Sequence, residues 1–124
     1  MRFRTLVLSA MLAAMLPADA ALAHHGWTWT AEGFFELTGI VKAVYVGNPH
    51  ATIDLDVEGV VWRVELAPPG PTQAAGFTET TVAPGDEITA IGNRSLDANE
   101  TRMKAVRVVV DGTNYDVYPT RAPN

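Results

Sequence analysis

Residues 51–66 read ATIDLDVEGVVWRVEL, and this stretch decides the fold class of the chain. From Ala51 to Val57 apolar residues alternate with polar ones, which is the pattern of a strand with one buried face. Glu58-Gly59 supplies a tight turn, and Val60 to Leu66 returns as a second strand. The carboxylates of Asp54, Asp56 and Glu58 are expected on a solvated outer face, because their regular strand spacing lacks the loop geometry of a calcium site. The stretch therefore predicts an antiparallel hairpin.

Further short strand patterns, separated by turn residues, lie on both sides of this hairpin. We expect strands over residues 35–46, 87–92, 102–110 and 115–118, with Gly39 marking a bulge in the first of them. Turns are expected at Asn48-Pro49, Pro84-Gly85-Asp86 and Asp111-Gly112.

The segment between the third and fourth strands is different. Its proline cluster, residues 68–71, is expected to exclude regular structure, and residues 72–77 are expected to form one or two helical turns with Thr72 as the cap. Five to six strands with one short helical insert predict an all-β fold, a small Greek-key barrel of the oligonucleotide-binding-fold type. A generic β-sandwich is the alternative.

The first 23 residues have the organisation of an export signal. Arg2 and Arg4 precede an apolar run from Leu6 to Leu16, and small residues follow up to Ala23. The run is too short for a stable membrane anchor. We therefore expect residues 1–23 to be a signal peptide, and residues 24–124 to be a single β-barrel domain with an amino-terminal tail over 24–33. Cleavage after Ala20 is the alternative. The expected location is periplasmic or secreted.

Composition excludes several classes of function. Without residues 1–23 the chain keeps seven of nine basic and thirteen of fourteen acidic residues, a net charge of −6 with neutral histidines. That charge opposes binding to nucleic acid. The chain has no cysteine, so it contains neither a disulfide nor a thiolate metal site. Met103 is the one methionine after the signal, which excludes a methionine-rich copper(I) site.

The three histidines stand at the predicted mature terminus and in a turn. Cleavage after Ala23 makes His24 the first residue, with its α-amine and ring nitrogen on one residue, and His25 follows directly. His50 lies in the turn Asn48-Pro49-His50. Several neutral nitrogen ligands without a thiol favour copper(II). We expect His24 and His50 to bind it together, with His25 as an alternative ligand; the competing interpretation is a solvated tail and a hydrogen-bonded turn histidine.

Two tryptophans follow these histidines with a period of two. Trp27 and Trp29 are expected to dock the tail onto the barrel by burying apolar area. No catalytic set is apparent, because Ser95 is the single serine after the signal and has no assignable histidine partner. Gly85 and Gly92 are expected to be turn glycines rather than parts of a phosphate-binding loop, so no other cofactor site is predicted.

Three functions remain open. The first is periplasmic copper binding for buffering or delivery, with a copper-handling or other periplasmic protein as partner. The second is a metal-free module that binds a periplasmic protein or small ligand. The third is an oxidative enzyme that holds copper between histidine and amine ligands, which the short chain disfavours.

The chain resembles an uncharacterised family of small exported bacterial proteins. In this family a signal peptide precedes His-His-Gly or His-His-Ser, and an Asn-Pro-His turn and a Pro-Gly-Asp turn follow. The corresponding residues here are His24-His25-Gly26, Asn48-Pro49-His50 and Pro84-Gly85-Asp86. The resemblance implies export and a small β-barrel, and it implies no activity.

Overall fold

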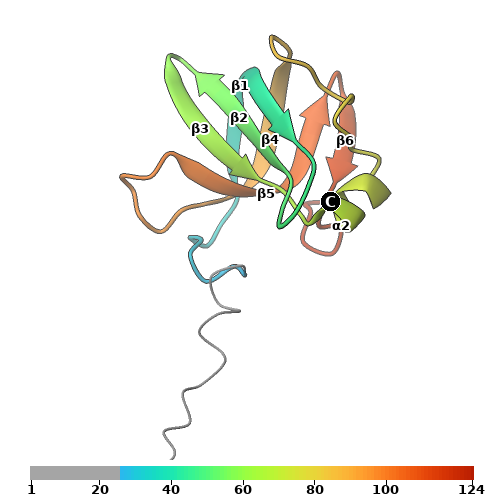
Figure 1. Ribbon diagram of the computed structural model, residues 1–124. Helices are drawn as coiled ribbons and strands as arrows, with labels where there is room; N and C mark the ends of the chain where they lie inside the picture. The colour runs from blue at the N-terminus through green and yellow to red at the C-terminus, as the bar shows by residue number, and fades with distance from the viewer. Residues whose placement is uncertain (1–25) are drawn as a thin grey trace, which may run out of the picture.

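The computed structural model describes residues 26–124, so the predicted signal peptide and the histidines at positions 24 and 25 lie outside the described residues. Within these residues, six strands and one short helix follow one another (Figure 1). They are β1 (Phe35–Tyr45), β2 (Thr52–Val57), β3 (Val60–Glu65), α2 (Pro69–Ala74), β4 (Glu87–Arg94), β5 (Arg102–Val110) and β6 (Thr113–Asp116).

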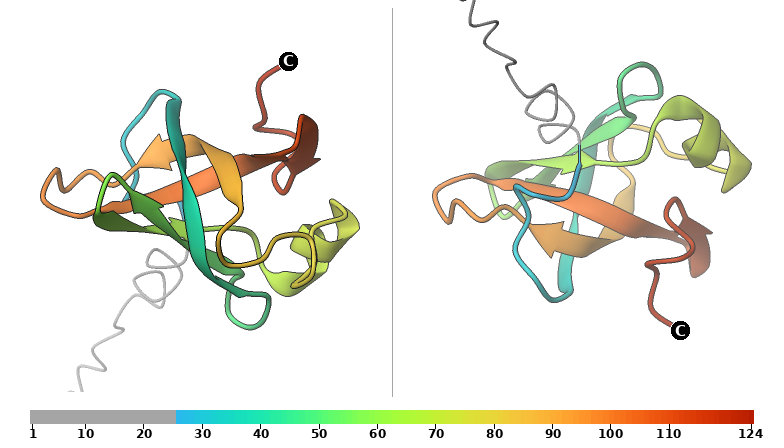
Figure 2. Two further views of the ribbon diagram at one scale, coloured as in Figure 1. Left: turned by 90° about the horizontal axis from the view of Figure 1, so that it is seen from above. Right: turned by 90° about the horizontal axis from the view of Figure 1, so that it is seen from below.

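The first five strands close into a ring. Antiparallel pairing joins β3 to β2, β2 to β1, β1 to β4 and β4 to β5. A short parallel ladder between β3 and β5, which sets Arg63 to Glu65 beside Arg102 to Lys104, completes the circle. β6 pairs with β5 outside the ring, and the views in Figure 2 show the strands winding around a common interior. The predicted small barrel with one helical insert is confirmed, and the β-sandwich alternative is wrong.

The hairpin of β2 and β3 has the predicted register. Ile53 and Leu55 are fully buried, and Leu55 lies opposite Trp62 of β3. Glu58 and Gly59 form the turn with φ values of 52° and 88°. These left-handed conformations match the right-handed twist of the two strands. Asp54, Asp56 and Glu58 lie on the outer face, as expected.

The helical insert begins earlier than the sequence predicts. α2 starts at Pro69, within the proline cluster that was expected to exclude regular structure. The prediction was wrong because the first N–H groups of a helix need no partner inside it, and the fixed φ of proline suits this position. Thr72 is not a cap but a fully buried residue whose hydroxyl donates to the Ala67 carbonyl oxygen at 2.9 Å.

Two glycines have other roles than predicted. The irregularity of β1 lies between Val41 and Ala43 instead of at Gly39. A Cβ on Gly39 would come within 2.7 Å of the Asp56 carbonyl oxygen, so this glycine permits close approach of β2. Gly92 is a strand residue of β4 and not a turn glycine, and it lies against the backbone of β5.

Candidate functional site

The amino-terminal segment, Gly26 to Ala31, packs on the outer face of β5. The Trp29 ring lies 3.8 Å from the Arg102 guanidinium carbon, and the Trp27 ring lies 4.7 Å from Lys104 Nζ. Backbone bonds fix the end of the segment: Leu96 N–H donates to the Trp29 carbonyl oxygen, and Ala31 N–H donates to the Arg94 carbonyl oxygen. The predicted docking of the tail by its two tryptophans is confirmed.

The carboxyl-terminal segment covers Trp27 as well. The Tyr118 ring meets Trp27 edge to face, with ring centroids 5.0 Å apart. The Arg121 guanidinium carbon lies 4.3 Å from the centre of the Trp27 ring. Residues near both ends of the described chain therefore meet at this indole.

Lys104 is the buried charge of this region. Its neighbours Met103 and Ala105 face the core, so Lys104 points outward, yet the residue is only 3 % exposed because the docked segments cover it. Nζ donates to the Gly26 carbonyl oxygen at 3.2 Å and also lies near the Tyr118 ring. Burial lowers the pKa of Lys104, and the nearby Glu65 carboxylate partly opposes this change.

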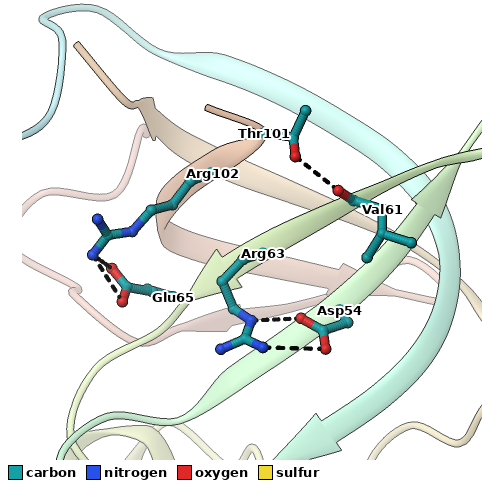
Figure 3. A network of polar contacts seen from close by, with 6 residues as sticks. All are labelled: Asp54, Val61, Arg63, Glu65, Thr101 and Arg102. Atoms are coloured by element: carbon teal, nitrogen blue, oxygen red, sulfur yellow. Dashed lines mark hydrogen bonds and ion pairs between the residues drawn. The ribbon is translucent and has the colours of Figure 1, made fainter. Parts of the chain in front are cut away.

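Charged pairs extend this region across the outer face of β3 and β2, as Figure 3 shows. One nitrogen of Arg102 donates to both carboxylate oxygens of Glu65, at 3.1 and 2.9 Å. Next to it, Arg63 pairs with Asp54 through a 2.5 Å bond from Nε. Each pair joins neighbouring strands, so carboxylates and cations alternate across this part of the barrel.

His50 lies at the end of the loop between β1 and β2 and is half-buried. The next residue is tied to the end of β3: Ala51 N–H donates to the Ala67 carbonyl oxygen, and Leu66 N–H donates to the Ala51 carbonyl oxygen. Pro49, preceding His50, has a cis peptide bond. The predicted turn at Asn48-Pro49 is present as a bend, and His50 lies between this bend and Ala51, which is tied to Ala67.

The docked segment and His50 are related by the strand register. From Trp29 to Trp27 the segment passes from Arg102 to Lys104 along β5. In β3, the same direction leads from Arg63 to Glu65. In β2, which is antiparallel to β3, it leads from Asp54 to Thr52 and on toward His50. The amino-terminal end of the described segment therefore points toward the end of the barrel that carries His50.

Within residues 26–124, no group of three or more His, Cys, Asp or Glu side chains could hold a metal ion. His24 and His25 lie outside this range. Ser95 has a structural role: its hydroxyl donates to Glu100 Oε2 at 2.7 Å and accepts from the Asp97 N–H.

No helix in the described part of the chain is long and apolar enough to cross a membrane.

Neither Lys104 nor Tyr118 stands out in the sequence. Alternation along β5 places Lys104 outside the barrel, and only the covering segment turns that position into a buried one. The spacing of Trp27 and Trp29 was the one signal in the sequence that a segment covers the outer face of β5.

Comparison with known proteins gives a family and no activity. No curated protein matches the chain. Residues 12–104 match the model described as "Family of unknown function (DUF6152)". This range includes all three histidines and the first four strands. Because the match covers most of the sequence, the chain belongs to this family of unknown function.

Proposed function

We propose that this protein binds copper(II) in an exported compartment and serves to buffer the metal or deliver it to a partner protein. The ligands are the α-amine and ring of His24 and the ring of His50, and His25 is the alternative ligand. Amine and imidazole nitrogens without thiolates are a donor set that suits copper(II).

The direction of the docked segment is the observation that carries the proposal. Gly26 is held by Lys104, whose backbone lies opposite Glu65, and Glu65 lies opposite Thr52. Two strand spacings separate β5 from β2, about 10 Å, and His50 lies two residues beyond Thr52, at most about 7 Å further along the chain. Two residues before Gly26 extend at most about 7 Å, and imidazole side chains add to this reach from both sides. The gap is therefore one that His24 or His25 can span.

The proposal first requires the correct amino terminus. We expect intact-mass analysis of protein exported in its native host to show a chain that begins at His24, because the small residues Ala21 and Ala23 fit the cleavage rule. A chain that begins at Ala21 would remove the His24 amine from the site and leave His25 and His50 as ligands.

The second expected result concerns the two distant ligands. One extra residue before His24 moves the amine and leaves every side chain intact, while His50→Ala removes the distant ring and preserves the terminus. Each change should weaken copper(II) binding by about tenfold or more, measured by competition titration at pH 7. Lowering the pH below about 6.5 should weaken copper binding by the parent progressively, because imidazole binds metal only when neutral.

The pattern of losses distinguishes the alternatives. A chelate formed by the tail alone loses affinity when the residue is added and keeps it in His50→Ala. Equal copper affinity in all three proteins would refute the proposal and leave the metal-free interaction module as the better interpretation.

A further inference from the structure

We infer that Lys104 is a positioning residue of the proposed copper site, which fixes Gly26 and Trp27 on the barrel so that the amino terminus reaches His50. This inference rests on the proposed function. Lys104 is assigned no role as a metal ligand.

The surroundings of Lys104 show why it serves as an attachment point. A buried ammonium group is costly unless it is paired and hydrogen-bonded. Here the Gly26 carbonyl oxygen accepts its hydrogen bond, and the rings of Trp27 and Tyr118 lie within 4.7 and 5.5 Å of Nζ. Two of these three groups belong to the amino-terminal segment. The amino-terminal segment therefore both covers this charge and supplies two of the groups that compensate it.

Further contacts restrict Trp27. Tyr118 packs against it in an edge-to-face pair, and the Arg121 guanidinium lies near its ring, while Trp29 is fixed on Arg102 two residues further along. A segment held at these points has lost most of its freedom before any metal arrives. Preorganisation of this kind raises the effective concentration of one ligand at the other. The loss of Lys104 should therefore remove the contribution of His50 to copper affinity. Copper binding by the His24 amine and ring should be preserved.

The first test is made without copper. Lys104→Met keeps an apolar side chain of similar length, and it removes the positive charge and the hydrogen-bond donor. The matched control is Arg107→Met, which removes a cation of the same strand whose guanidinium pairs with Asp116. In ¹⁵N-labelled protein we expect the indole N–H signal of Trp27 to move in Lys104→Met and to stay in place in Arg107→Met. Circular dichroism checks that both variants remain folded.

The second test is a double-mutant cycle on copper affinity with His50→Ala. We expect His50→Ala to weaken copper binding by about tenfold or more in the parent and in Arg107→Met, and by less than about twofold in Lys104→Met. A general loss of structure would also remove the contribution of His50, so the cycle is read only for variants that circular dichroism shows to be folded. An equal cost of His50→Ala in the parent and in Lys104→Met would overturn the inference and leave the copper proposal intact.

The two proposals fail in different ways. Absence of copper binding in the parent would refute the copper function. It would also refute the role of Lys104 in positioning a copper ligand. The indole signal would still show whether Lys104 holds the segment. An unmoved Trp27 signal in Lys104→Met would overturn the inference whatever the copper data show.

Discussion

Gly92→Ala is expected to destabilise the protein by about 3 kcal/mol or more, at the upper end of the cost of overpacking. Gly92 lies in β4 opposite Ala105 of β5. A Cβ at this position would overlap the Lys104 carbonyl oxygen and come within 2.7 Å of the Ala105 Cα. These atoms belong to the backbone of a paired strand and cannot rotate away, so the β4–β5 ladder would have to separate. Urea unfolding followed by tryptophan fluorescence measures the loss.

Gly70→Ala is the matched control for this experiment. Gly70 lies in α2, has no neighbouring atom within 4 Å of an added Cβ, and has no positive φ. The same substitution should therefore be neutral or stabilise the protein by up to about 1 kcal/mol. Similar unfolding midpoints for the two variants would show that β4 and β5 are further apart than described.

Phe77→Ala is expected to cost about 3–5 kcal/mol, as truncations of buried phenylalanine do. Phe77 follows α2 and is completely buried, and its ring meets Tyr115 edge to face at 5.8 Å. Alanine would leave a cavity among core residues that the short helix cannot fill. Thermal and urea unfolding should both register the change.

Phe34→Ala removes the same side chain from an exposed position. The ring of Phe34 is 55 % exposed and lies just before β1. We expect its loss to change the free energy of unfolding by no more than about 0.5 kcal/mol. A larger cost for Phe34→Ala than for Phe77→Ala would contradict the described core.

The sequence predicted those parts of the fold that local periodicity controls. Alternation around Leu55 and the Glu58-Gly59 turn fixed the central hairpin, because a shift of one residue would expose its apolar face. The beginning of α2 was missed because proline was taken only as a helix breaker. The last strand lies at Thr113–Asp116 instead of residues 115–118, since its first two residues are exposed and show no alternation.

The candidate site was predictable only in part. Histidine positions and the paired tryptophans were visible in the sequence, and the docking of Trp27 and Trp29 followed from their apolar character. The burial of Lys104 was not visible, because the residue that accepts its hydrogen bond is 78 positions away. A local pattern carries no information on such a contact. The strand register that relates the segment to the His50 loop likewise depends on barrel closure.

The closing ladder between β3 and β5 has a consequence for self-association. A β-strand whose backbone groups are unpaired along one side can recruit another extended chain, and a closed ring removes such open edges. Within residues 26–124, the strand outside the ring is β6, which is four residues long. It carries the Asp116 carboxylate paired with Arg107, and Pro119 follows shortly after it. Charge and proline both oppose the addition of a further strand. The folded barrel thus offers little template for aggregation, although no disulfide holds it together.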